Sequence, residues 1–359
     1  MDQHTHTQKS TISRITAALL ASALLCSCVF LAGFKKTETL TLYTWADMFP
    51  QEVLKGFTKE TGIKINYVNF DYDETMFAKL QAAEGGDYDL VIADDYIIEQ
   101  AVAAGLVAEL DKTKLSNYGN IDPTFTGQFY DPQDLYTVPY GAGIIEIAYY
   151  PERVGFEITG YEDLWNEALK DRVGIIGNIR VVDGIVLQTL GYSMNTVSES
   201  EIGEAGEKLQ KLAPNIRLIK DDYLNDDLVA GEIDAALVYT SMGTMAALTD
   251  PDVRLVLPEE GLGYGVQAMF IPSKAPHAEA AYQFIDYILR PEISAECFAY
   301  LGYYCTVKTA EDLIPEEIRP FITLPEDLSV DRMEMIENIP GEIYDLHENI
   351  WNRFKSLCS

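Results

Sequence analysis

Aromatic and acidic side chains follow two predicted strands near the start of the chain, at 40–44 and 88–93. They are Trp45 and Asp47 after the first strand, and Asp94, Asp95 and Tyr96 after the second. In an open α/β sheet, ligands bind outside the carboxyl ends of the strands, so these side chains would line one mouth of the sheet. Trp45 is favoured as a ligand contact because an aromatic residue at a strand end is placed for a cleft. Such a mouth could hold an organic cation.

Several acidic residues near this mouth also suit a structural role. Asp94 and Asp95 precede an Ile-rich helical start, so either one could cap that helix instead of contacting a ligand. Asp71, Asp73 and Glu74 fit a turn and the first turn of a helix better than a ligand site. Residue type alone leaves both roles open for Asp94 and Asp95.

Strands and helices alternate along the rest of the chain. Periodicity and stop signals predict further strands at 63–70, 144–149, 173–176 and 235–239, and helices at 50–61, 74–83, 161–168, 184–190, 200–212, 278–289 and 340–357. Such βαβ units imply mainly parallel sheets with right-handed crossovers. No repeat or flexible linker interrupts the pattern. Removing a 27-residue leader from 359 residues leaves 332, which at about 150 residues per domain suggests two lobes joined by extended crossings.

The amino terminus has the pattern of an export signal. Lys9 and Arg14 precede an apolar run at 15–25, which ends in Leu25-Cys26-Ser27-Cys28. This end resembles a bacterial lipoprotein signal, so residues 1–27 are predicted to be removed and Cys28 to be lipidated. The alternative is an uncleaved membrane helix at 15–34, since about 20 apolar residues span a bilayer. Either anchor would hold the protein outside the cytoplasmic membrane.

Composition argues against several classes of function. The 57 acidic and 26 basic residues give a net charge of −31, which argues against nucleic-acid binding. Cys297, Cys305 and Cys358 form no C-x-x-C pair, and only His277 and His347 remain after the leader, so no zinc or other metal site is expected. No nucleotide-binding or hydrolase motif is present. We therefore expect neither an enzyme nor a cofactor.

Short segments spread over nearly the whole mature chain carry a family resemblance. They lie at 43–45, 57–64, 73–80, 88–91, 138–140, 163–165, 190–193, 289–291 and 302–303. In their order and spacing the chain resembles the spermidine/putrescine-binding proteins of ABC importers. The resemblance implies a two-lobed α/β fold of the type II periplasmic-binding-protein class, with a mainly parallel, helix-flanked sheet in each lobe and the ligand in the cleft between them. The lobes would close by hinge motion.

The same resemblance implies boundaries, a location and partners. A tether at 28–38 would precede lobe 1, at 39–141 and 268–334, and lobe 2, at 142–267 and 335–359. The protein would be a periplasmic or otherwise extracytoplasmic lipoprotein, and a monomer. It would deliver putrescine or spermidine to a membrane permease and its ATPase.

Site residues carry over from the family one at a time. Trp45 matches an aromatic residue that covers the polyamine, and Asp47 matches an acid of the putrescine-binding members. Tyr96 and Tyr303 match tyrosines near the pocket, and Tyr239 stands where the family has a tryptophan. Asp94 and Asp95 replace small hydroxyl residues, and Glu337 falls at a polar position that closes over the ligand. Aromatic rings at Trp45, Tyr96 and Tyr239 would contribute roughly 0.5–2 kcal/mol of cation–π attraction.

Other positions depart from the family pattern. Gln267 replaces the central amine-binding aspartate and Gly265 its neighbouring tryptophan, while Val181 and Asn178 replace two acids of lobe 2. A charge-assisted hydrogen bond to a carboxylate contributes roughly 1.5–3 kcal/mol, so these losses must be offset elsewhere. The candidates to replace the acids are Asp47, Asp94, Asp95, Asp183 and Glu337. We therefore expect an amine held by acids that have moved toward lobe 1.

Three alternatives remain open on sequence grounds. Two tyrosine pairs, Tyr149-Tyr150 and Tyr303-Tyr304, could supply phenolate ligands to ferric iron. The substituted pocket would also suit a different amine, or a sensor lipoprotein that feeds no importer.

Overall fold

The computed structural model describes residues 38–324 and 333–358. The predicted signal segment 1–27, the lipidated Cys28 and the tether up to residue 37 lie outside the described residues. Within the described ranges, no helix combines the length and the apolar composition needed to cross a bilayer.

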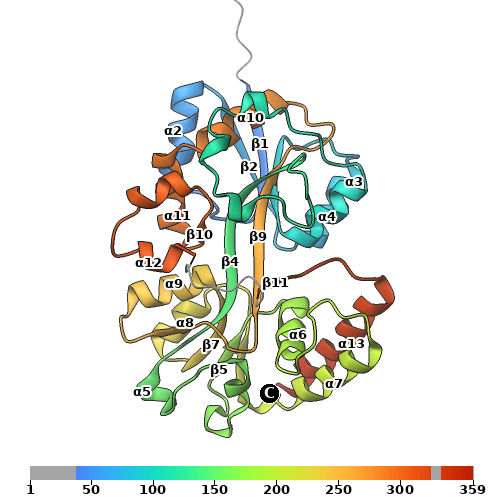
Figure 1. Ribbon diagram of the computed structural model, residues 1–359, viewed down its shortest axis with the longest axis vertical. Coiled ribbons are helices and arrows are strands. Elements are labelled where there is room, and N and C mark those ends of the chain that lie inside the picture. Colours follow the sequence, from blue (N-terminus) through green and yellow to red (C-terminus); the bar gives the residue numbers. More distant parts are fainter. Residues whose placement is uncertain (1–37, 325–332, 359) are drawn as a thin grey trace, which may run out of the picture. The chain divides into compact units, whose positions relative to one another are not determined.

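The described chain is a mixed α/β structure (Figure 1). Its strands are β1 (Thr39–Thr44), β2 (Lys64–Asn69), β3 (Leu90–Ala93), β4 (Thr137–Tyr149), β5 (Val173–Ile175), β6 (Ile216–Ile219), β7 (Ala235–Tyr239), β8 (Arg254–Val256), β9 (Leu262–Phe270), β10 (Tyr304–Cys305) and β11 (Met333–Met335). Its α-helices are α2 (Gln51–Thr61), α3 (Asp73–Ala82), α4 (Asp95–Ala103), α5 (Pro151–Val154), α6 (Ile179–Gln188), α7 (Glu199–Gln210), α8 (Leu224–Ala230), α9 (Thr240–Thr249), α10 (Ala278–Ile288), α11 (Pro291–Leu301), α12 (Arg319–Ile322) and α13 (Gly341–Leu357).

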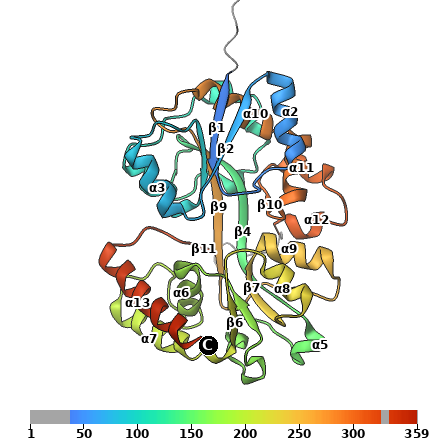
Figure 2. The same ribbon diagram turned by 180° about the vertical axis from the view of Figure 1, so that it is seen from behind.

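Two long strands connect two groups of parallel strands. The strand order is β2-β1-β3-β9-β4-β7-β5-β6, in which β1 is parallel to β2 and β3, and β5 is parallel to β6 and β7. Strands β4 and β9 are antiparallel to each other and run through both halves (Figures 1 and 2). We call the half with β1, β2 and β3 lobe 1, and the half with β5, β6 and β7 lobe 2. The carboxyl ends of both groups of parallel strands define where ligand-binding side chains are expected.

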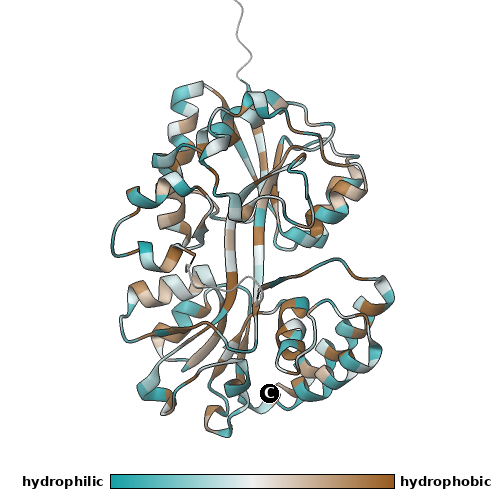
Figure 3. Ribbon diagram, in the orientation of Figure 1, coloured by the Kyte–Doolittle hydropathy of each residue, from teal (hydrophilic) through white to brown (hydrophobic). Residues whose placement is uncertain are grey.

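Helices cover both faces of the lobe 1 sheet. Leu40 and Leu42 of β1 pack with α2 and α10 on one face, whereas Tyr43 packs with α3 and α4 on the other. Successive side chains of a strand point to opposite faces, so β1 contributes to the core on both sides of the sheet. The covering helices carry hydrophobic residues on one side and hydrophilic residues on the other (Figure 3). Lobe 2 has a separate hydrophobic core.

Most predicted elements occur within a few residues of their expected positions, but one strand and two helices differ. The strand predicted at 144–149 begins seven residues earlier, at Thr137. The segment predicted as a helix at 161–168 forms two 3₁₀ turns, Tyr161–Trp165 and Glu167–Leu169. Asn166 is extended between them, and its side-chain oxygen accepts a hydrogen bond from the Ala168 N–H at 3.0 Å. This local side-chain bond competes with the helical pattern. The helix predicted at 184–190 begins at Ile179 instead, after Asn178 caps the Val181 N–H at 3.2 Å.

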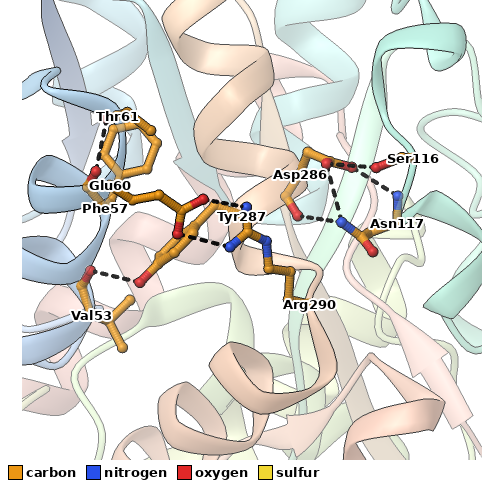
Figure 4. Close-up of polar contacts among 9 residues, drawn as sticks. All are labelled: Val53, Phe57, Glu60, Thr61, Ser116, Asn117, Asp286, Tyr287 and Arg290. Carbon is orange, nitrogen blue, oxygen red and sulfur yellow. Dashed lines mark hydrogen bonds and ion pairs between the residues drawn. The ribbon is translucent and has the colours of Figure 1, made fainter.

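Polar contacts in lobe 1 join α10 and the residue that follows it, Arg290, to α2 and to the loop at Ser116 and Asn117, away from the strand ends (Figure 4). Arg290 donates to both Glu60 oxygens at 2.9 and 2.7 Å and lies against the Tyr287 ring. The Asp286 carboxylate accepts from the Ser116 hydroxyl at 2.8 Å and from the Asn117 N–H at 2.8 Å. These contacts hold α10 against α2 and against the loop at Ser116 and Asn117. They include none of the predicted site residues.

Asp286→Ala is expected to reduce the free energy of unfolding by about 1.5–3 kcal/mol, the usual worth of hydrogen bonds to a charged group. Urea unfolding measures this loss. Glu60→Gln is the matched comparison, because its ion pair with Arg290 is largely exposed and such pairs contribute about 1 kcal/mol or less. Equal losses of unfolding free energy in the two variants would show that the Asp286 hydrogen bonds contribute no more than an exposed ion pair.

Candidate functional site

Two acidic side chains meet where β3 ends in lobe 1. Asp94 occupies the N-cap position of α4, but its side chain makes no capping hydrogen bond. Its backbone N–H donates to Asp73 Oδ1 over 3.5 Å, and its carboxyl group also contacts the Asp73 and Gln267 side chains. Of the two roles left open for Asp94, helix capping is therefore not fulfilled by its side chain. Asp94 occupies the cap position, but its carboxylate faces Asp73 and Gln267. Asp73 does begin α3 as expected, but it also reaches Asp94.

The pKa values of both acids show how unfavourable this arrangement is without a ligand. Burial raises the pKa of Asp73 well above its usual value, and the charge of Asp94 raises it further. Burial also raises the pKa of Asp94. In the described part of the chain, no Lys, Arg or His side chain forms an ion pair with either carboxylate. Buried carboxylates without a cation must either hold a proton or attract a positive guest.

Asp95 has a different environment from Asp94. It is the first residue of α4, is 5% exposed, and accepts the Tyr96 N–H at 2.8 Å. Burial raises the pKa of its carboxyl group, and the charge of Asp94 adds to the effect. A cation from lobe 2 faces this region: burial lowers the pKa of Arg180, and the charges of Tyr96 and Asp95 partly oppose that shift. Asp95 thus differs from Asp94 in accepting a backbone N–H of its own helix, although neither carboxylate forms an ion pair within the described residues.

Arg180 is a site residue that the sequence reasoning missed. Its guanidinium is buried and donates to the Glu337 carbonyl at 3.3 Å and to Asn195 Oδ1 at 3.2 Å. A signal for it exists in the sequence, because a cation in the first turn of an apolar helix opposes the helix dipole and needs a specific reason. Here that reason is the connection of α6 to the segment after β11.

Three tyrosines surround the Asp94 carboxylate. The Tyr96 hydroxyl donates to Glu74 Oε1 at 3.0 Å. Tyr239 ends β7; its pKa is raised well above the usual value by burial and then by the charges of Asp221 and Asp94. Burial also raises the pKa of Tyr303, whose hydroxyl contacts Ser241 and Gln267. Phenols from both lobes thus converge on one acidic centre.

Gln267 lies in β9 between this acid and one of these phenols. Its side chain contacts both Asp94 and Tyr303, while its own Oε1 is buried and has no hydrogen-bond partner. An amide oxygen left in this state can accept a hydrogen bond from a ligand N–H. Gln267 therefore contributes an acceptor to the site without contributing a charge.

The remaining predicted ligand residues lie around this centre or at its rim. Trp45 is half-buried after β1, with its ring 4.8 Å from the Phe70 ring. Asp47 is exposed in a turn with φ of 56°. The Glu337 side chain is exposed, while its backbone N–H donates to Asn195 Oδ1 at 2.8 Å. No described hydrogen bond or ion pair joins Asp47 or the Glu337 carboxylate to Asp94.

Asp183 does not replace a missing ligand acid. It is 3% exposed inside lobe 2 and lies 2.9 Å from His347 Nδ1 of α13. This pairing corrects the expectation that Asp183 could face the ligand, since a carboxylate enclosed between α6 and α13 serves to join those two helices.

The two tyrosine pairs do not form one ferric site. Tyr304 pairs in register with Ala142 of β4, and Tyr149 lies seven residues further along the same strand, a distance of about 23 Å along extended backbone. The Tyr150 hydroxyl donates to Asp250 at 2.7 Å. Among the residues that the structure describes, no group of three His, Cys, Asp or Glu side chains is arranged to hold a metal ion.

Comparison with known proteins agrees with this arrangement. The model of the bacterial extracellular solute-binding protein family matches residues 52–319. The spermidine/putrescine-binding periplasmic protein of Salmonella typhimurium is 30% identical over 94% of this chain and 97% of its own length. The putrescine-binding periplasmic protein PotF of Escherichia coli is 30% identical over 89% of this chain and 92% of its own length.

A solved structure shows the same fold. The spermidine/putrescine ABC transporter substrate-binding protein PotD of Streptococcus pneumoniae, in complex with calcium and HEPES, superposes with a TM-score of 0.79. The two chains are 28% identical, and the match covers 90% of this chain and all of that one. The predicted two-lobed periplasmic-binding-protein architecture is therefore confirmed. The chain belongs to the bacterial extracellular solute-binding protein family, and its relatives there include the spermidine/putrescine-binding proteins of ABC transporters.

Proposed function

We propose that this protein is the extracytoplasmic substrate-binding component of an ABC importer and that its ligand is a linear diamine or polyamine, with putrescine and spermidine as the first candidates. One observation carries the choice of ligand: Asp73 and Asp94 are held together without a protein cation. A bound ammonium would supply the missing positive charge. The names of the relatives, which describe spermidine and putrescine binding, support the same choice.

In this proposal each side chain at the site has a defined task. The first ammonium lies at Asp94, where Gln267 Oε1 accepts one of its N–H groups. Tyr96, Tyr239 and Trp45 cover the alkyl carbons. Charge-assisted hydrogen bonds of this kind contribute roughly 1.5–3 kcal/mol each, and rings beside the cation add roughly 0.5–2 kcal/mol.

Other residues complete the transport cycle in the proposal. Asp47 and Glu337 lie at the rim and meet the ligand when the lobes close. The hinge lies where the chain passes between the lobe segments 39–141 and 268–334 and the segments 142–267 and 335–359. The closed monomer then docks on the permease and its ATPase.

The anchor belongs to the same proposal. Leu25-Cys26-Ser27-Cys28 supports removal of residues 1–27 and lipidation of Cys28. Mass spectrometry of the mature amino terminus after membrane extraction distinguishes this anchor from an uncleaved helix at 15–34, which would leave the full-length chain.

Native mass spectrometry of the protein lacking residues 1–37, followed by calorimetry, tests the ligand. We expect a co-purified mass equal to a di- or polyamine, and saturable binding of putrescine or spermidine to the stripped protein. Butane-1,4-diol is the matched control, because it has the shape of putrescine without the charges. Equal affinity for the diol, or no binding of any amine, would refute the proposed function. A gene pair for a permease and an ATPase beside this gene separates an importer from a sensor.

A further inference from the structure

A second carboxylate stands at a strand end of lobe 2. Asp221 follows β6, and its Oδ1 accepts the Gly177 N–H at 2.9 Å. Gly177 follows β5, the parallel neighbour of β6. A Cβ atom at position 177 would lie 3.0 Å from Asp221 Oδ2, so any larger residue there would press on the carboxylate and make it shift. The Asp221 carboxylate is therefore oriented by the protein, although its side chain is exposed.

A cavity of about 470 Å³ opens beside this carboxylate. Gly177, Asp221, Asp222 and Tyr223 of lobe 2 line it together with Tyr72 of lobe 1. A pocket lined by side chains from both lobes is placed to hold part of a ligand that both lobes enclose.

Two phenols connect this cavity with the Asp94 centre. Tyr239 ends β7 and Asp221 follows β6, and both strands are parallel to β5, so the two residues lie at the same edge of the lobe 2 sheet. Burial raises the pKa of Tyr239, and the charges of Asp221 and Asp94 raise it further. The Tyr303 hydroxyl is similarly influenced by Asp94 and Asp222. An aromatic ring of lobe 2 thus shares its sheet edge with Asp221 and is influenced by Asp94 of lobe 1, as a site for a diamine requires.

The two lysines that line the cavity have other partners. Lys220 forms an ion pair with Asp227 of α8. The Lys355 ammonium lies 5.7 Å from the centre of the Trp351 ring. Neither of them pairs with Asp221 in the described structure, so the Asp221 carboxylate is available to a ligand cation.

We propose that Asp221 binds the second ammonium of a diamine whose first ammonium lies at Asp94. Its alkyl chain would cross the Tyr239 ring. Asp221 thus takes over the task of the lobe 2 acids that are missing at Val181 and Asn178. This inference rests on the proposed function and assigns the lobe 2 acid that holds the second positive charge of the diamine.

Calorimetry with putrescine and thermal-shift titration with 1-aminobutane test the assignment. The two ligands share a four-carbon chain, but 1-aminobutane has one ammonium. We expect Asp221→Asn to weaken putrescine binding about tenfold, the loss of one charged contact of about 1.4 kcal/mol, and to leave the 1-aminobutane response unchanged. Asp226→Asn, which removes the same charge from the neighbouring α8, should change neither ligand.

Gly177→Ala provides a second variant that keeps every charge. Its added Cβ should displace the Asp221 carboxylate and reduce the preference for putrescine over 1-aminobutane. The proposal is overturned if Asp221→Asn affects both ligands equally or affects neither. Failure of the wild-type protein to bind either amine would instead refute the proposed function, and this inference with it.

Discussion

Asp94→Asn is expected to weaken putrescine binding ten- to a hundredfold and at the same time to stabilise the ligand-free protein. The loss of affinity follows from removal of a buried carboxylate that forms no ion pair with a protein cation, a contact worth roughly 1.5–3 kcal/mol. The gain in stability follows from the raised pKa values of Asp73 and Asp94, which show that burial and mutual repulsion oppose their ionisation. Removing one charge relieves that repulsion.

Opposite changes in affinity and stability distinguish a ligand-binding acid from a structural one. Calorimetry gives the first quantity and urea unfolding without ligand gives the second. Asp71→Asn is the matched control, because Asp71 is an exposed acid two residues before Asp73 and should alter both quantities little. Asp95→Asn should weaken binding less than Asp94→Asn, since the Asp95 carboxylate already accepts the Tyr96 N–H at 2.8 Å. A greater loss from Asp95→Asn would reverse the assignment of the two acids.

The raised pKa values of Asp73 and Asp94 also predict how putrescine binding depends on pH. A carboxyl group whose pKa is raised remains protonated above the usual carboxyl range, and a proton competes with an ammonium for the same oxygens. Putrescine affinity of the wild-type protein should therefore rise with pH as the Asp73–Asp94 pair loses its proton. In Asp94→Asn this part of the pH dependence should diminish.

Glu146→Gln is expected to make the protein more stable in alkaline solution. Glu146 lies in β4, is 3% exposed, and its Oε1 has no hydrogen-bond partner. Burial raises the pKa of this carboxyl group to about 8. Gly243 of α9 leaves the room that this side chain occupies, since a Cβ there would meet Glu146 Oε1.

The direction of the pH effect follows from proton linkage. Because the folded state binds the Glu146 proton more tightly than the unfolded state, stability from this group is complete below the ordinary glutamate pKa of 4.5 and is lost as pH rises through about 8. A shift of that size corresponds to a loss on the order of 5 kcal/mol at pH values above it. Glutamine has nearly the same shape as glutamate but no charge, so the free energy of unfolding of the variant should not fall in this way as the pH rises.

Urea unfolding between pH 5 and pH 9.5 would measure the difference between wild-type and Glu146→Gln proteins. Other buried acids titrate in both proteins, so the difference between their curves isolates Glu146. Glu152→Gln, at an exposed position on α5, should follow the wild-type curve. A constant difference across the whole pH range would show that Glu146 is ionised in the folded protein at neutral pH.

Local sequence was sufficient to predict much of the fold. The strand at 235–239 occurs as predicted, and the helix predicted at 50–61 ends before Gly62, which adopts φ of 76°. Apolar runs, helix stops and strand lengths are properties of a few neighbouring residues, so they can be read before the chain is folded. The helix predicted at 161–168 was wrong because side-chain hydrogen bonds at Asn166 replaced the helical ones.

The site was only partly predictable. The sequence placed Trp45, Asp94 and Tyr96 after strands, and those strand ends do lie on the side of the sheet where the candidate site forms. It did not reveal that Asp73, 21 residues before Asp94, would share its buried environment. It also offered Asp183 as a ligand acid, although His347, 164 residues away in the chain, is its partner.

The amino-acid sequence by itself determined the alternation of strands and helices, the supply of rings and carboxylates at strand ends, and the family to which the chain belongs. Only the tertiary structure decided which carboxylates lack a cation. The physical reason is that the charge state of a buried acid depends on every group packed around it. Asp73 beside Asp94 and the open space beside Asp221 come from elements that are distant in the sequence.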